Sequence, residues 1–92
     1  MTKVTDEMIE ELYKTLLTLK TVDDCDIFFA DLCTHKEIEN MAQRIVAARL
    51  LKKGETYNEI MDKTGISSAT LARVSNCVKY GKGYTNFIDI KK

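Results

Sequence analysis

Apolar residues recur at helical spacing along most of the chain, and local capping signals divide this pattern into separate helices. Thr5 or Asp6 is expected to open the first helix, and Thr21 with Asp24 the second. Thr34 and Glu37 have capping-box spacing and predict a long third helix that ends at Lys53, before Gly54. The apolar positions of these three helices are Met8, Ile9, Leu12, Leu16, Leu19; Cys25, Phe28, Phe29, Leu32; and Ile38, Met41, Ala42, Ile45, Leu51.

Residues 56 to 79 carry the pattern of a helix-turn-helix. Thr56 and Glu59 form a second capping box, and Gly65 follows after about two turns. A glycine at this point favours the end of a helix, because it adopts positive φ at little steric cost. Ser67 or Ser68 then caps another helix. The apolar contacts between the two helices are expected from Ile60, Ile66, Leu71 and Val74. After Lys79, Gly81 and Gly83 break the pattern, and the apolar tail of Tyr84, Phe87, Ile88 and Ile90 predicts no defined element.

Two helices joined by a glycine turn also occur in ordinary small helical domains, so charge is needed to interpret this motif. The chain has 14 basic and 14 acidic residues, but residues 1–33 carry a net charge of −5 and residues 34–92 a net charge of +5. No Asp or Glu lies between Lys63 and Ile88. This asymmetry favours a polyanionic partner for the C-terminal half, while a solvated basic face is the alternative for any single lysine.

Length and composition limit the other possibilities. We expect 92 residues to form one domain, with helices for dimerisation in 1–53 and the helix-turn-helix in 56–79. The sequence contains no run of about 20 apolar residues that could span a membrane, and its acidic N-terminus does not resemble a signal peptide. A cytoplasmic protein is therefore expected. The apolar stripes of the N-terminal helices exceed what a monomer of this size can cover, which favours a homodimer over a compact monomer.

The sequence offers no constellation for catalysis. Cys25, Cys33, Cys77 and the single His35 lack metal-site spacing, and the cysteines are interpreted as reduced thiols in or near the core. Phosphate-binding loops and dinucleotide motifs are absent from the sequence. We therefore expect no enzyme activity, no metal and no cofactor.

The order of motifs from Asp31 to Gly81 resembles the tryptophan repressor family, and most closely its branch of uncharacterised bacterial tryptophan-repressor-like proteins. The elements that carry the resemblance are Leu32-x-Thr34, Arg44, Leu50-Leu51 followed by Gly54-Glu55, and Thr70, Arg73, Ser75 and Asn76. The resemblance implies an all-α, intertwined homodimer whose recognition helices enter successive major grooves of double-stranded DNA.

The resemblance also implies a ligand site. Thr34, Arg44 and Arg73 match the threonine and the two arginines that hold an indole amino acid in the tryptophan repressor. This chain departs from the family pattern at Val74, where the repressor has a glycine beside the ring, and at Cys77, where it has a serine; the first loop of the motif is also one residue shorter. Because a branched side chain would intrude on the ring, tryptophan is not expected to bind. Arg44 could instead pair with Glu39 or with acids near Asp31 inside the dimer, and Arg73 could hold a phosphate.

These observations predict a sequence-specific DNA-binding transcription regulator that acts as a repressor by occupying its operator. The phosphate contacts are expected from Thr56, Lys63, Ser67, Lys79 and Lys82, and the outward face of the recognition helix is expected to present Ser68, Ala69, Thr70, Ala72 and Arg73. The alternative is a helical protein-interaction module in which the same two helices dock a partner helix and never meet DNA.

Overall fold

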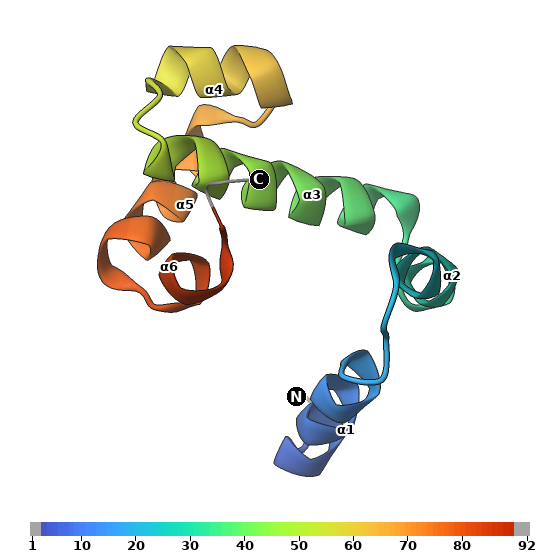
Figure 1. Ribbon diagram of the computed structural model, residues 1–92. Helices are drawn as coiled ribbons and strands as arrows, with labels where there is room; N and C mark the ends of the chain where they lie inside the picture. The colour runs from blue at the N-terminus through green and yellow to red at the C-terminus, as the bar shows by residue number, and fades with distance from the viewer. Residues whose placement is uncertain (1–2, 90–92) are drawn as a thin grey trace. The chain divides into compact units, whose positions relative to one another are not determined.

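The computed structural model describes residues 3–89, which form α-helices and no strand (Figure 1). The predicted all-α fold is therefore confirmed over these residues. The chain divides into two compact units, Met1–Thr34 and His35–Lys92, and each is described by itself. None of the helices in residues 3–89 has the length and apolarity needed to cross a membrane. Ile90, assigned above to the apolar tail, lies outside the described residues.

The first unit contains helices α1 (Asp6–Leu16) and α2 (Val22–Leu32), and both begin where the capping signals predict. The Thr5 hydroxyl accepts a hydrogen bond from the Met8 amide at 3.3 Å, and the Thr21 hydroxyl accepts one from the Asp24 amide at 3.0 Å. α1 ends at Leu16, so Leu19 lies beyond the helix. No residue of α1 or α2 is buried, although Leu16, Phe28 and Phe29 are half-buried.

The second unit contains α3 (His35–Lys52), α4 (Tyr57–Thr64), α5 (Ser68–Tyr80) and α6 (Gly83–Phe87). α3 packs against both α4 and α5, and α5 packs against α4 and α6 (Figure 1). The long helix thus belongs to the same compact unit as the helix-turn-helix. It provides the support on which the two shorter helices are held.

The face of α3 that is buried differs from the predicted one. Ala47 and Ala48 are fully buried in the core, whereas Ile45 keeps 46% of its surface exposed and Ala42 is exposed. Ala47 and Ala48 share this core with Leu71 of α5, and side chains as small as alanine allow packed helices to approach closely. Apolar residues surround most of α3, so its sequence pattern alone did not identify the face that α5 covers.

The C-terminal tail forms a short helix that the sequence did not predict. The Lys52 ammonium donates hydrogen bonds to the carbonyls of Tyr84, Thr85 and Ile88, at 3.4, 3.1 and 2.7 Å. A positive group stabilises the end of a helix where carbonyls lack partners. Arg49 adds a hydrogen bond from Nε to the carbonyl of Asp89, at 3.1 Å. α3 therefore anchors α6 through contacts between residues more than thirty positions apart in sequence.

Candidate nucleic-acid interface

α4 and α5 are joined by the three-residue turn that the local signals predict. The capping box is present, with the Thr56 amide donating to Glu59 Oε1 at 2.9 Å and the Glu59 amide donating to the Thr56 hydroxyl at 3.2 Å. Gly65 ends α4 with φ of +73°, and its amide donates to the Met61 carbonyl. Ser67 then caps α5 by accepting a hydrogen bond from the Thr70 amide at 3.2 Å.

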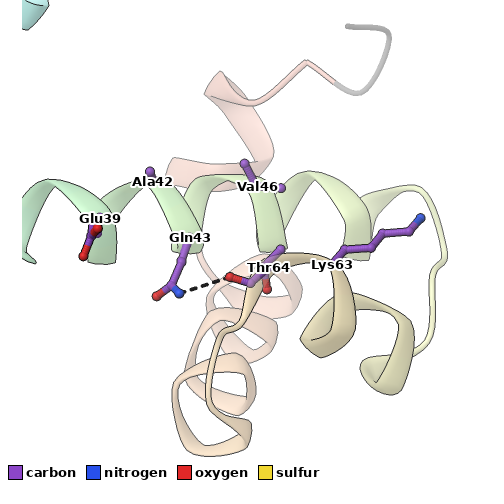
Figure 2. A pocket seen from close by; sticks show the side chains of 6 residues that line it. All are labelled: Glu39, Ala42, Gln43, Val46, Lys63 and Thr64. Atoms are coloured by element: carbon purple, nitrogen blue, oxygen red, sulfur yellow. Dashed lines mark hydrogen bonds between the residues drawn. The ribbon is translucent and has the colours of Figure 1, made fainter.

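The orientation of the two helices is fixed by the core beneath them. Ile60 of α4, Ile66 of the turn, and Leu71 and Val74 of α5 are buried together, as predicted. Gln43 of α3 adds a polar contact, because its side-chain amide donates to the Thr64 carbonyl at the end of α4, at 3.1 Å (Figure 2). The end of α4 is therefore held to α3 directly, and the turn that leads into α5 starts from a fixed point.

The solvent side of α5 carries small and polar side chains. Ser68, Ala69, Ala72 and Arg73 are exposed, and Thr70 is half-buried, with its hydroxyl accepting from that of Ser67 at 2.9 Å. A helix with such short side chains can approach another surface closely along its first two turns. Apart from Arg73, the predicted outward face of α5 thus carries only short side chains.

The basic side chains predicted to contact phosphates differ in their surroundings. Lys79 and Lys82 are exposed, and within residues 3–89 neither ammonium has an ion-pair partner. Lys63 is paired with Glu55, with Nζ 2.8 Å from Oε1, and this hydrogen bond raises the pKa of Lys63 above its ordinary value. At the start of α4, the hydrogen bond donated by the Thr56 amide lowers the pKa of Glu59. The polar groups of Thr56 and Lys63 are therefore already engaged within the chain.

Arg44 and Arg73 line the same recess, which lies between α3 and the first turns of α5 and has a volume of about 430 Å³. Arg44 donates from Nε to the carbonyl of Asn40 in its own helix, at 3.3 Å, which leaves its terminal nitrogens available. The recess also contains Lys36, Asn40 and Gln43, which the sequence analysis did not assign to a site. A signal was present, because Lys36, Asn40 and Arg44 are spaced four residues apart and share one face of α3.

Three other residues singled out in the sequence lie elsewhere. Thr34 is the last residue of the first unit, whereas the recess belongs to the second. Val74 is 1% exposed within the core and does not line the recess. Cys77 borders a separate hollow beside α6 and is half-buried, as is Cys33, but Cys25 is exposed and is not a core residue.

Comparison with known proteins identifies the class to which this fold belongs. Residues 7–91 match the family model of the Trp repressor protein, so the chain belongs to the Trp repressor family, a family of DNA-binding regulators. The chain is 43% identical over 79 residues to the uncharacterized protein YerC of Bacillus subtilis. The matched region covers 86% of this chain and 76% of that protein.

Two solved structures resemble this chain closely. A crystal structure from Staphylococcus aureus, provisionally named a Trp repressor, has a TM-score of 0.85 and 38% identity, and the match covers 90% of this chain and 84% of that one. A TrpR-like protein from Eubacterium eligens also has a TM-score of 0.85, with 39% identity over 90% of this chain and 87% of that one. The predicted resemblance to the family is therefore confirmed.

Proposed function

We propose that this chain is a sequence-specific DNA-binding transcription regulator, active as a homodimer, that represses by occupying its operator. The observation that carries the proposal is the α4–turn–α5 unit, in which a rigidly supported helix presents an exposed face of short side chains. Helix-turn-helix proteins place their second helix in the major groove in this manner. Membership of the Trp repressor family supports the same interpretation.

In this arrangement α5 is the recognition helix. Ser68, Ala69 and Ala72 face the base edges, and Thr70 and Arg73 lie beside them. Alanine offers no hydrogen bond, so direct readout by these side chains discriminates poorly among bases. We infer that water-mediated contacts and the shape of the duplex provide much of the specificity.

The phosphate contacts follow from the free cations and the start of α5. Lys79 and Lys82 are exposed without ion-pair partners among the described residues, so they can neutralise phosphates without first breaking a pair. The amides of the first turn after Ser67 lie at the positive end of the α5 dipole and favour an anion. Thr56 and Lys63 contribute less, because their polar groups are engaged with Glu59 and Glu55.

The homodimer is supported by the unburied helices of the first unit. Met8, Leu17, Val22 and Ile27 each keep more than half of their surface exposed, at 55%, 82%, 85% and 69%. Exposed apolar stripes of this extent are typical of a surface that another chain covers. A second copy would also give two recognition helices related by two-fold symmetry, which suits a palindromic operator. Light scattering at micromolar concentration should return twice the chain mass of 10.5 kDa, and a monomer would contradict the proposal.

DNA binding is tested by fluorescence anisotropy with a labelled random duplex at two salt concentrations. The affinity should fall steeply as salt rises, because binding releases the counterions condensed on the phosphates. A protein-interaction module that docks a partner helix would show no such binding. Absence of any duplex binding by the dimer at low salt would therefore favour that second function.

A further inference from the structure

Helix α6 is too short to be stable through its own backbone hydrogen bonds. It has five residues, Gly83–Phe87, and the side chain of Lys82 makes no capping hydrogen bond at its start. A helix of this length persists in water only when tertiary contacts hold it, because its nucleation costs more than its few hydrogen bonds return. The contacts between α6 and the rest of its unit therefore decide whether this segment is helical.

Lys52, at the end of α3, makes three of these contacts. Its half-buried side chain donates from Nζ to the carbonyls of Tyr84, Thr85 and Ile88. Three acceptors match the three N–H donors of an ammonium group, and hydrogen bonds from a charged donor are about twice as strong as neutral ones. The carbonyls at the end of a helix also form the negative end of its dipole, which favours a cation there. Lys52 is thus a charged anchor for α6.

The position of α6 determines the course of the chain after the recognition helix. Two residues connect the end of α5 to the start of α6, and Lys82 is the second of them. The Thr85 hydroxyl donates to the Val78 carbonyl in α5, at 3.2 Å, and the Lys82 carbonyl accepts from the Asn86 amide, at 2.9 Å. The backbone of Lys82 therefore takes part in the hydrogen bonding of α6, and its position depends on the anchor at Lys52.

We propose that Lys52 is a positioning residue for DNA binding. By holding α6 on α3, it fixes the backbone of Lys82, whose exposed ammonium contacts a phosphate. A lysine on a fixed backbone loses less conformational freedom on binding than one on an unfolded segment. Lys52 uses its donors within the chain, so its effect on the duplex is exerted through Lys82. The inference rests on the proposed function, because the phosphate contact of Lys82 belongs to it.

The anchor is tested first, without DNA, by hydrogen exchange of the full-length dimer. Lys52→Met keeps a side chain of similar length and removes the ammonium. The amides of Asn86 and Ile88, which are hydrogen-bonded in α6, should then exchange about tenfold faster or more, because the loss of charged hydrogen bonds raises the open fraction of the helix. The amides of α3 and of the middle of α5 should keep their protection, which would show that the core remains folded.

Lys53→Met is the matched control for the exchange measurement, because it removes the same charge from the neighbouring position. Lys53 is exposed, and within residues 3–89 its ammonium forms no ion pair. Lys53→Met should leave the exchange of α6 unchanged. Equal exchange of α6 in Lys52→Met and Lys53→Met would show that Lys52 is not an anchor and would overturn the inference.

The positioning role is tested by a double-mutant cycle on duplex affinity, measured by fluorescence anisotropy at low salt. Lys52→Met should weaken binding about tenfold for each protomer, which corresponds to fixing the backbone of roughly one residue. In a Lys82→Ala background, Lys52→Met should cause no further loss, because the contact it supports is already absent. Losses that simply add would mean that Lys52 contacts the duplex itself and would contradict an indirect role.

The exchange and affinity measurements separate this inference from the proposed function. Faster exchange of α6 in Lys52→Met, with no duplex binding by the unaltered dimer, would refute the DNA-binding function and the positioning role together. Duplex binding that Lys52→Met leaves unchanged would refute this inference alone. Faster exchange of α6 together with a loss of affinity that depends on Lys82 is the result expected.

Discussion

Replacing single lysines should separate phosphate contacts from the effect of net charge. Lys82 is exposed, and its ammonium has no ion-pair partner within residues 3–89, whereas Lys63 lies 2.8 Å from Glu55. Both Lys82→Ala and Lys63→Ala lower the charge of each protomer by one. Only Lys82→Ala should remove a phosphate contact, because Lys63 would first have to leave its carboxylate. The two variants therefore form a matched pair that differs in the local environment of the lysine.

The magnitude follows from counterion release, which contributes about 0.9 to the slope of log affinity against log salt for each phosphate contacted. Lys82→Ala should flatten the slope by about 0.9 for each protomer, or about 1.8 for a dimer on its operator. Between about 50 and 200 mM salt, the variant should thus lose about twelvefold less affinity than the unaltered protein. Lys63→Ala should leave the slope nearly unchanged.

The measurement is fluorescence anisotropy with a labelled duplex at several salt concentrations, and Lys79→Ala should behave like Lys82→Ala. The loss should be similar on specific and random duplexes, since phosphate contacts carry no sequence information. Equal flattening by Lys63→Ala and Lys82→Ala would show that the slope reflects net charge alone and would refute the assignment of Lys82 to a phosphate.

Three further predictions concern the core, the ligand and pH. Leu71→Ala removes a fully buried side chain and should lower the free energy of unfolding by about 2 to 5 kcal/mol, measured by denaturant titration. The control is Tyr80→Ala, at an 84% exposed position, which should change the free energy of unfolding by less than about 0.5 kcal/mol. Free L-tryptophan should show no micromolar binding by calorimetry, because Val74 fills, within the core, the position where the family pattern has a glycine beside the ring. Clear binding would mean that the ring lies away from Val74 and would refute this reasoning. The lowered pKa of Glu59 means that its contribution to stability is present above its ordinary value of 4.5 and is lost as pH falls through the lower, folded-state pKa. Unfolding of Glu59→Gln followed from neutral pH into acid should show a shallower loss of stability than the unaltered protein, and identical acid limbs would contradict the assignment.

The sequence determined the features that depend on residues close together in the chain. Thr5, Thr21 and Ser67 cap their helices, and Gly65 ends α4, because each of these interactions spans four residues or fewer. The motif itself was equally predictable, since the buried positions of α4 and α5 follow helical spacing. The family resemblance rested on the same local features, and it is confirmed over residues 7–91.

Only the tertiary structure decided which side chains lie together across long separations in sequence. Lys63 resembled Lys79 and Lys82 in the sequence, but the turn before α4 places it against Glu55. Lys52 lies at the end of α3, yet its ammonium donates to carbonyls at the end of α6, more than thirty positions away in sequence.

Packing between helices also determined which residues line the recess and which face of α3 is buried. Ala47 and Ala48, rather than the larger Ile45, are fully buried in the core with residues of α4 and α5, and Arg44 and Arg73 line one recess. A helical pattern defines which residues share a face, but the free energy that selects the buried face comes from packing with other helices. Capping is decided by neighbours in sequence, whereas the charges that make a binding surface are decided by neighbours in space.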